Sequence, residues 1–317
     1  MKAIILDAPG EPENLTQQEI PIPTLNPKEV LVEVYAISIN PVDIKTRKGG
    51  ALFDSLKEQD PIILGWDISG IVRSIGNEVT RFKDGDEVFG MVNFPGHGRA
   101  YAAYVAAPEG DLAVKPKNLS HPEAASATLA ALTAWQVMVH EAKLKEGQHL
   151  FMHAAAGGVG HFAVQIARHL GAVVTGTASA SNSEFLDEIG VQEHIDYTKE
   201  SFEDRVKDVD MVFDPIGGET TVKSYGILKP GGTLISIVGG VKDSHNDLIS
   251  EKKISAKNYL VRSSGKDMEA LADLLGQGIL KPHISHEFEF NQIAAAHKQS
   301  ETGKTRGKII VNVVAKE

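Results

Sequence analysis

Cysteine is absent from this chain of 317 residues. That absence alone excludes disulfide bonds, thiolate catalysis, iron–sulfur clusters and cysteine-ligated zinc sites. Histidine and carboxylate side chains are scattered along the sequence, and we predict that the chain holds no metal. A metal site assembled from distant histidines and carboxylates is the alternative that the sequence leaves open.

Clusters of basic residues are also scarce. Asp and Glu (42) outnumber Lys and Arg (32), which gives a formal net charge of −10. Only Lys304, Arg306 and Lys308 form a small basic group. Nucleic-acid binding requires clustered positive charge for the phosphates, so no nucleic-acid partner is expected.

Long apolar runs are missing as well. No segment reaches the roughly 18 consecutive apolar residues of a membrane-spanning helix, so no membrane association is expected. The apolar run Ala3–Leu6 is ended by Asp7 and is too short for the core of a secretory signal. It is better interpreted as a first β-strand, and we expect a cytoplasmic protein.

The first 120 residues have the pattern of an irregular, mostly β domain. Short β-like runs are separated there by Pro, Gly and Asn. Examples are Val30–Ile39, Ile68–Ile75 and Glu87–Val92.

The pattern changes at Ser120. Ser120 followed by Glu123 is a capping box, in which each side chain bonds a backbone N–H at the start of a helix. A long apolar helix is predicted over Ala124–Ala142. Short strands then alternate with helices, which indicates a parallel sheet covered by helices. The predicted strands are Leu150–His153, Val173–Thr177, His194–Asp196, Met211–Asp214, Leu234–Val238 and Lys257–Val261.

The C-terminal region contains a predicted helix, Met268–Gly276, a strand, Ile284–Phe290, a second short helix and a final strand, Lys308–Val314. The sheet of the middle region is already complete, so we expect the final strand to return to the first domain. The predicted domains are residues 1–120, completed by residues 266–317, and residues 121–265.

The sharpest local signal is the glycine-rich turn within Leu150–Gly160, which joins a predicted strand to a predicted helix. Such a turn collects free backbone N–H groups and the positive helix end at one point, where a pyrophosphate can bind. The GxGxxG fingerprint has Ala155 in its first glycine position here, so a tight turn without a ligand is the other interpretation. The residues predicted to bind the cofactor are Ala156, Gly157, Gly158, Val159 and Gly160.

The end of the second predicted strand bears on the choice between NADH and NADPH. An NAD site has an acidic residue about twenty residues after the turn to bind the ribose 2′-hydroxyl, but here no acid occurs before Glu184. This favours NADPH, with a plain Ser/Asn helix cap as the alternative. The residues predicted to donate to a 2′-phosphate are Thr177, Ser179, Ser181 and Asn182.

Several motifs in order resemble the zinc-independent quinone oxidoreductase (zeta-crystallin-like) branch of the medium-chain dehydrogenase/reductase superfamily. The resemblance covers essentially the whole chain. Its motifs are Ile39–Lys45, Gly65–Gly70, Leu132–Trp135, Ala154–Gly160, Ile195–Tyr197, Phe213–Asp214 with Gly217 and Gly218, and Thr305–Lys308.

The resemblance implies an α/β fold: a Rossmann doubly wound parallel sheet, plus a GroES-like, mostly β catalytic domain, with the active site between them. It also implies homodimers or homotetramers. Where the alcohol-dehydrogenase branch carries its catalytic zinc ligands, this chain has Ser38, Trp66 and Asp67. NADPH-using relatives often have Lys or Arg where this chain has Ser181.

The resemblance also assigns site residues. Asn40 and Lys45 are predicted to lie beside the nicotinamide ribose and to donate hydrogen bonds to the developing oxyanion; a simple turn at Asn40 and a solvated Lys45 are the alternative. Asp43 is expected to brace this segment. The remaining predicted cofactor contacts are Thr133, Tyr197, Asp214, Val238, Gly239, Arg306 and Lys308. The alternatives are a back-bonded helix threonine at Thr133, an ordinary half-buried tyrosine at Tyr197, and a solvated surface cluster at Thr305–Lys308.

Without zinc, the substrate should accept hydride readily, as a quinone or an α,β-unsaturated carbonyl does. The predicted function is therefore NADPH-dependent hydride transfer to such a small molecule. Two alternatives are kept: an enoyl-thioester reductase, and an NADPH-binding protein with little turnover.

Overall fold

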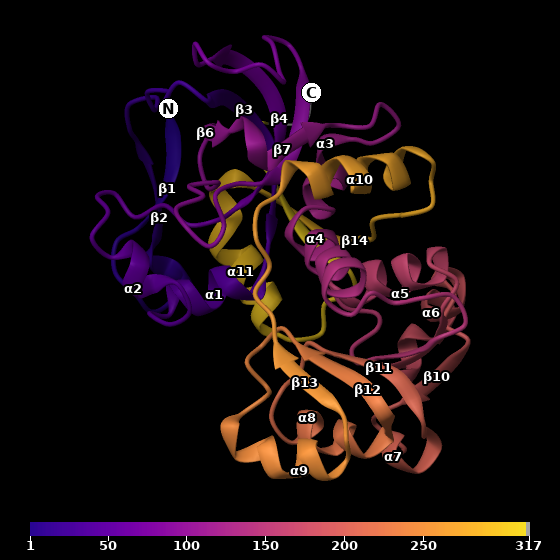
Figure 1. The fold of residues 1–317 in the computed structure, drawn as a ribbon. Coiled ribbons are helices and arrows are strands. Elements are labelled where there is room, and N and C mark those ends of the chain that lie inside the picture. The colour runs from indigo at the N-terminus through magenta and orange to yellow at the C-terminus, as the bar shows by residue number, and fades with distance from the viewer. Residues whose placement is uncertain (315–317) are drawn as a thin grey trace. The chain divides into compact units, whose positions relative to one another are not determined.

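The computed structural model describes residues 1–314 of the chain. The chain divides into two compact units, and each has its own sheet (Figure 1). The first unit contains Met1–Leu132 and the segment from Val261 onward, and the second contains Thr133–Leu260. Within residues 1–314, no helix has the length and apolar character needed to cross a membrane.

The first unit is built on a seven-stranded sheet in the order β14-β15-β3-β4-β5-β7, with β6 also paired to β3. The long strand β3 (Glu29–Ile39) pairs antiparallel with β4, β6 and β15, and β15 pairs parallel with β14. The C-terminal segment therefore completes a sheet begun near the N-terminus. The other strands are β4 (Asp67–Ile75), β5 (Glu87–Met91), β6 (Tyr104–Pro108), β7 (Leu112–Val114), β14 (Ile284–Glu289) and β15 (Lys308–Asn312).

A two-stranded sheet and several helices accompany this larger sheet. Strands β1 (Lys2–Leu6) and β2 (Leu15–Glu19) pair antiparallel, so the apolar run at the N-terminus is a strand, as predicted. The helices are α1 (Pro41–Arg47), α2 (Phe53–Leu56), α3 (His121–Ser126), α10 (Gly265–Gly276) and α11 (Ile293–Glu301).

The second unit contains a six-stranded parallel sheet in the order β10-β9-β8-β11-β12-β13. With the strands numbered within this unit, the order is 3-2-1-4-5-6, as in a Rossmann fold. Successive strands are added toward one edge of the sheet from β8 to β10 and toward the other edge from β11 onward. Each predicted strand is present, with bounds shifted by a few residues. The strands are β8 (His149–Met152), β9 (Val173–Ala178), β10 (Glu193–Asp196), β11 (Val209–Asp214), β12 (Leu228–Ser236) and β13 (Ser255–Asn258).

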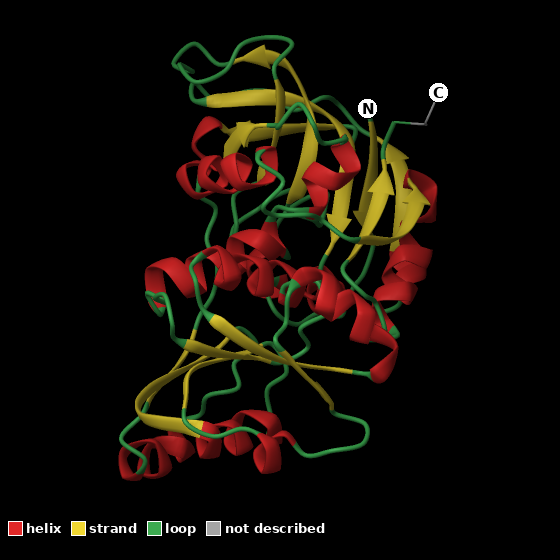
Figure 2. Ribbon diagram, turned by 90° about the vertical axis from the view of Figure 1, so that its right-hand side faces the viewer, coloured by secondary structure: helices red, strands yellow, loops and turns green. Residues whose placement is uncertain are grey.

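Helices cover both faces of this sheet, α5 and α6 on one side and α7, α8 and α9 on the other (Figures 1 and 2). On the second side, Phe151, Val212 and Leu234 of the sheet pack with Phe202 in one buried apolar cluster. Their burial removes apolar surface from water and stabilises the packing of α7 against the sheet. The helices are α5 (Gly160–His169), α6 (Ser183–Ile189), α7 (Phe202–Arg205), α8 (Glu219–Ser224) and α9 (Asn246–Glu251).

The single helix predicted over Ala124–Ala142 is wrong. The capping box at Ser120 is present, but α3 ends at Ser126, α4 (Leu129–Trp135) follows, and Gln136–Glu141 is a π-helical turn. The break has a tertiary cause, because the N–H of Leu129 donates to Oδ1 of Asp67 at 3.0 Å, and the Thr128 hydroxyl donates to the carbonyl of Ala125. A carboxylate from β4 thus caps α4.

Candidate functional site

The glycine-rich turn lies in the second unit, between the end of β8 and the start of α5. It follows the carboxyl end of β8, at the point where the strand order reverses, which is where open α/β sheets bind ligands. A Cβ on Gly160 would meet the carbonyl oxygen of Ala154 at 2.2 Å, so no side chain fits there. Glycine at position 160 therefore lets the helix lie close against the turn.

The backbone amides of this turn are suited to binding a negatively charged group. The N–H of Ala155 donates to the carbonyl of Thr177 on β9, and the N–H of Gly157 donates to the carbonyl of Ala154 within the turn. Among the described residues, the N–H groups of Ala156, Gly158 and Val159 have no acceptor. Free amides at a helix N-terminus form an anion site, so the residues present fit a dinucleotide pyrophosphate.

The polar end of β9 divides into an inner and an outer part. Thr177 is buried, and its hydroxyl accepts a hydrogen bond from the N–H of Ala154 at 3.1 Å. Ser179 and Ser181 lie beyond it, with their hydroxyl oxygens 3.0 Å apart, and Asn182 donates to Ser179. Only this outer group has the partial exposure that a 2′-phosphate contact requires.

Of the other predicted cofactor residues of the second unit, Thr133 lies in α4, and the rest lie at or just after the ends of strands. Asp214 is fully buried at the end of β11, and its carboxylate accepts from the N–H groups of Ile216 and Gly217 and from the Thr221 hydroxyl. It therefore braces the loop that follows β11. The remaining positions differ in exposure: Thr133 2%, Val238 37%, Tyr197 63%, and Gly239 in a positive-φ turn after β12.

In the first unit, Asn40 stands at the centre of a buried polar cluster. Its amide nitrogen donates to Oδ2 of Asp67 at 2.7 Å and to the carbonyl of Ser38 at 3.3 Å. Its amide oxygen accepts from the ammonium group of Lys308, which also donates to the carbonyl of Ile39. Both amide hydrogens of Asn40 thus have protein acceptors, so a hydrogen bond to a substrate would have to replace one of them.

Asp43 braces this segment as expected, because its Oδ2 accepts from the backbone N–H of Asn40 at 2.6 Å. Burial raises the pKa of Asp43 to about 8 and also raises the pKa of Asp67. Burial lowers the pKa of Lys308, against the attraction of the two carboxyl groups. A buried ammonium flanked by two carboxyl groups is close to charge balance when one carboxyl keeps its proton.

The basic residues predicted for the site have different environments. Lys45 is exposed on α1, whereas Lys308 is only 3% exposed on β15. Lys308 was predicted to contact the cofactor, but its ammonium group donates to the amide oxygen of Asn40 and to the carbonyl of Ile39. Arg306 is half-buried. Sequence reasoning did not foresee the pairing of Asn40 with Asp67 or with Lys308, because neither contact has a local sequence signal.

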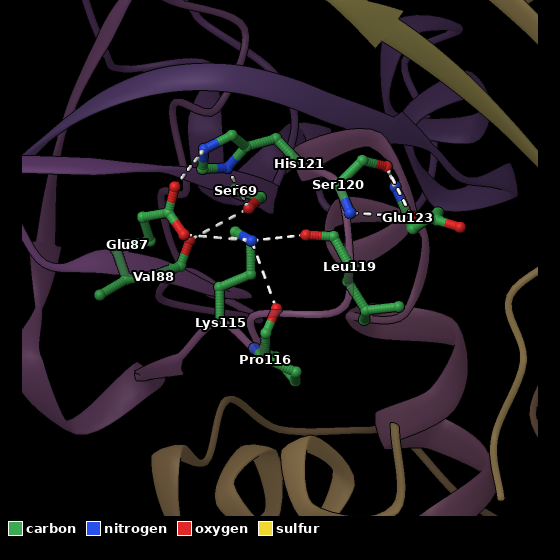
Figure 3. Close-up of polar contacts among 9 residues, drawn as sticks. All are labelled: Ser69, Glu87, Val88, Lys115, Pro116, Leu119, Ser120, His121 and Glu123. Carbon is green, nitrogen blue, oxygen red and sulfur yellow. Dashed lines mark hydrogen bonds and ion pairs between the residues drawn. The ribbon is translucent and has the colours of Figure 1, made fainter. Parts of the chain in front are cut away.

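Figure 3 shows a second polar cluster of the first unit, where His121 lies between Ser69 and Glu87. The Ser69 hydroxyl is 2.8 Å from Nδ1 of His121, and Nε2 of His121 is 3.6 Å from Glu87. Lys115 pairs with Glu87 at 3.2 Å. Although serine, histidine and a carboxylate also form hydrolytic triads, Ser69 is fully buried within β4. The cluster therefore ties the start of α3 to β4 and β5.

Comparison with known proteins identifies the family. Residues 26–117 match the family described as "Alcohol dehydrogenase GroES-like domain", and residues 189–311 match the one described as "Zinc-binding dehydrogenase". The 2-methylene-furan-3-one reductase of Solanum lycopersicum is 32% identical over 308 residues, which cover 94% of this chain and 75% of that protein. The chain belongs to the medium-chain dehydrogenase/reductase superfamily.

Solved structures of the medium-chain dehydrogenase/reductase superfamily share the whole fold. The quinone oxidoreductase of Coxiella burnetii matches with a TM-score of 0.93 and 35% identity over 99% of each chain. The quinone oxidoreductase of Escherichia coli, solved in complex with NADPH, matches with a TM-score of 0.87 and 25% identity over 99% of this chain and 100% of that one. These comparisons support a medium-chain oxidoreductase that uses a nicotinamide cofactor.

Zinc is the metal that the superfamily implies, and the donor set of this chain does not fit it. The positions that the family resemblance assigns to zinc ligands hold Ser38, Trp66 and Asp67. The indole N–H of Trp66 donates to the carbonyl of Gly96, and both oxygens of Asp67 accept from Leu129 and Asn40. A hydroxyl, an indole and an engaged carboxylate lack the sulfur and imidazole ligands of a catalytic zinc site. Across residues 1–314, no three His, Asp or Glu side chains gather as a metal site.

Proposed function

We propose that this chain is a zinc-independent, NADPH-dependent reductase that transfers hydride to a quinone or another α,β-unsaturated carbonyl compound. The observation that carries the proposal is the turn at residues 154–160, whose free amides lie at the switch point of a Rossmann sheet. When bound, the dihydronicotinamide supplies the hydride. The protein has to hold the dinucleotide at its phosphates and donate hydrogen bonds to the acceptor oxygen.

The preference for NADPH is proposed from the group of Ser179, Ser181 and Asn182. Hydroxyl and amide groups can donate to a 2′-phosphate, and the first acidic side chain after them, Glu184, belongs to the first turn of α6. The complex of the Escherichia coli relative with NADPH supports the same cofactor.

The acceptor class follows from the chemistry available to these residues. Reduction of a conjugated carbonyl spreads the arriving charge onto an oxygen atom, so hydrogen-bond donors suffice to stabilise it. Lys45 has an exposed ammonium on α1 and is the proposed donor, and Asn40 is proposed to shape the same segment. The relatives named for reduction of a furanone and of quinones support this class.

The test is oxidation of NADPH by the pure, chelator-treated protein, followed through the dihydronicotinamide absorbance. We expect turnover with quinones and enones, little with saturated aldehydes, and a lower KM for NADPH than for NADH. Loss of turnover on chelation with recovery on addition of zinc would contradict the zinc-independent proposal. Absence of turnover on every quinone and enone, with intact NADPH binding, would favour a binding protein with little turnover.

An enoyl-thioester reductase is the second candidate, because it performs the same conjugate addition of hydride. Acyl-carrier and coenzyme A thioesters present phosphate groups and call for a basic entrance. Comparison of kcat/KM for an enone with that for an enoyl thioester of the same chain length separates the two. A higher value for the thioester would replace our proposal.

We also propose that the chain forms a homodimer or homotetramer. The strand β13 is an edge of the Rossmann sheet, and Leu260, two residues after it, is 53% exposed. An exposed edge strand can pair with that of a second copy. Light scattering coupled to gel filtration tests this, and a monomer at micromolar concentration would contradict it.

A further inference from the structure

His153 lies between the end of β8 and the glycine-rich turn. It has no role in the hydride transfer proposed above. Its side chain is only 3% exposed, and its ring packs edge-on against Phe151 and Phe202. A buried imidazole must have its two nitrogen atoms satisfied, so its partners indicate what it does.

The direction of each hydrogen bond around His153 can be deduced. The hydroxyl of Ser224 donates its single proton to the carbonyl of Thr220 at 2.7 Å. Nε2 of His153 is 2.8 Å from the oxygen of Ser224, which must therefore accept. This places the ring proton of His153 on Nε2 and leaves a lone pair on Nδ1.

That lone pair faces Thr177 of the neighbouring strand β9. The hydroxyl of Thr177 is 3.5 Å from Nδ1 of His153, the longest link of the series. The same oxygen accepts from the N–H of Ala154 at 3.1 Å, so its proton is available for Nδ1. The bonds thus run from Ala154 through Thr177 to His153, and from His153 to Ser224.

Ala154 is the residue whose conformation sets the glycine-rich turn. Its φ of 49° is in the left-handed region, which is unfavourable for a residue with a Cβ. Its carbonyl accepts from the N–H of Gly157 at 2.9 Å and lies against Gly160, where a Cβ would approach to 2.2 Å. A shift of Ala154 would therefore move the free amides of the turn, at Ala156, Gly158 and Val159.

We propose that His153, as the Nε2–H tautomer, is a positioning residue for dinucleotide binding, because it orients Thr177 to hold Ala154 in its left-handed conformation. This inference rests on the proposed function, since it assumes that the turn binds NADPH. The neutral state that it requires agrees with burial, which lowers the pKa of His153 to about 4 against the attraction of Asp214 and Glu203. A protonated ring would carry a donor on Nδ1 and oppose the Thr177 hydroxyl.

The kinetic test compares four variants with the wild type. His153→Leu and Thr177→Val should raise the KM for NADPH about five- to tenfold while kcat changes less than twofold, because the turn binds ground state and transition state alike. Thr177→Ser keeps the hydroxyl and should recover most of the affinity that Thr177→Val loses. Leu234→Ala, a core substitution in the same sheet, should lower the melting temperature without changing the KM.

The outcomes separate a positioning role from a structural one. If His153→Leu and Thr177→Val change the KM no more than Leu234→Ala does, the inference is overturned. Nitrogen-15 NMR of the wild type gives an independent readout: we expect the Nε2–H tautomer and slow exchange of the Ala154 amide. The Nδ1–H tautomer would overturn the inference even if NADPH binds. The expected tautomer in a protein that binds no NADPH would instead remove the proposed function.

Discussion

The ammonium group of Lys308 donates a hydrogen bond to the amide oxygen of Asn40, 268 residues earlier in the chain. On the other side of the same amide, the nitrogen of Asn40 donates to Asp67. The two charged groups fix which end of the amide is which, because an ammonium requires an acceptor and a carboxylate requires a donor. The C-terminal strand therefore orients a side chain at the end of β3.

Removal of the Lys308 charge should expose how this cluster is balanced. Lys308→Met leaves the buried carboxyl groups of Asp43 and Asp67 without their cation, and we expect a loss of about 3–5 kcal/mol in the free energy of unfolding. Lys308→Met combined with Asp67→Asn removes both charges and should recover most of that lost stability. We expect kcat to stay low in the double variant, because no charged group then fixes the orientation of the Asn40 amide. Urea unfolding and kcat are the measurements.

A surface ion pair provides the control for that experiment. Arg73 pairs with Glu33 at 2.6 Å, and both side chains are partly exposed. Arg73→Met should change the free energy of unfolding by no more than about 1 kcal/mol. If Lys308→Met is equally mild, the buried cluster is not charge-balanced as described.

The raised pKa of Asp43 gives a prediction with a definite sign. Between its ordinary pKa of 3.8 and the folded value of about 8, the folded chain binds a proton at Asp43 that the unfolded chain does not. The stability contributed by that proton is present at pH 4 and is lost as the pH rises toward 8. Asp43→Asn keeps a neutral side chain, so its stability relative to the wild type should increase from pH 5 to pH 8.5.

Urea unfolding at several pH values measures that difference. Asp54→Asn is the control, because Asp54 has a side chain that is 86% exposed. We expect its stability relative to the wild type to stay constant over the same range. A constant difference for Asp43→Asn as well would mean that Asp43 is ionised in the folded protein.

Acid should loosen the cluster of Figure 3. Burial and the nearby charge of Lys115 lower the pKa of His121 from 6.5 to about 4, against the attraction of Glu87. The unfolded chain then binds a proton between pH 6.5 and 4 that the folded chain refuses, so stability is lost as the pH falls through this window. His121→Gln should make the decrease shallower, by at most about 1.4 kcal/mol per pH unit.

The slope of unfolding free energy against pH checks this prediction. His169→Gln serves as the control, since His169 is exposed at the end of α5, and it should leave the slope as in the wild type. A His121→Gln slope equal to that of the wild type would show that His121 titrates alike in the folded and unfolded chains.

Gly160 should tolerate no side chain. A Cβ there would lie 2.2 Å from the Ala154 oxygen and 2.8 Å from the Ala155 Cα, so Gly160→Ala has to push the helix away from the turn. We expect the dissociation constant for NADPH to rise by at least about tenfold, a loss of ~1.4 kcal/mol. Gly226→Ala is the matched control, because nothing lies within 4 Å of a Cβ at that position. Calorimetric titration with NADPH measures both, and equal affinities would contradict the role of the turn.

The cofactor preference can be probed at Asn182. Asn182→Asp places a carboxylate where the 2′-phosphate is proposed to bind, so the KM for NADPH should rise about tenfold while that for NADH changes little. Steady-state kinetics with both cofactors are the measurement. An equal change for the two would mean that the 2′-phosphate lies elsewhere.

Local features of this protein were determined by its sequence. The capping box at Ser120, the alternation of strands and helices, and the glycine-rich turn each depend on contacts within a few residues, and each is present in the structure. Polar groups close together in sequence satisfy one another with little dependence on the rest of the chain. The parallel sheet covered by helices could therefore be anticipated from pattern, and the family from the motifs.

The contacts that give the candidate site its character were decided by tertiary structure. Asp67 interrupts a helix that the sequence predicts as continuous, since its carboxylate takes the N–H of Leu129, 62 residues away. Lys308 is buried against Asn40, although the sequence predicted a contact with the cofactor for it. Partners so distant leave no local periodicity, and only the folded chain brings their charges close enough to compensate for the loss of water.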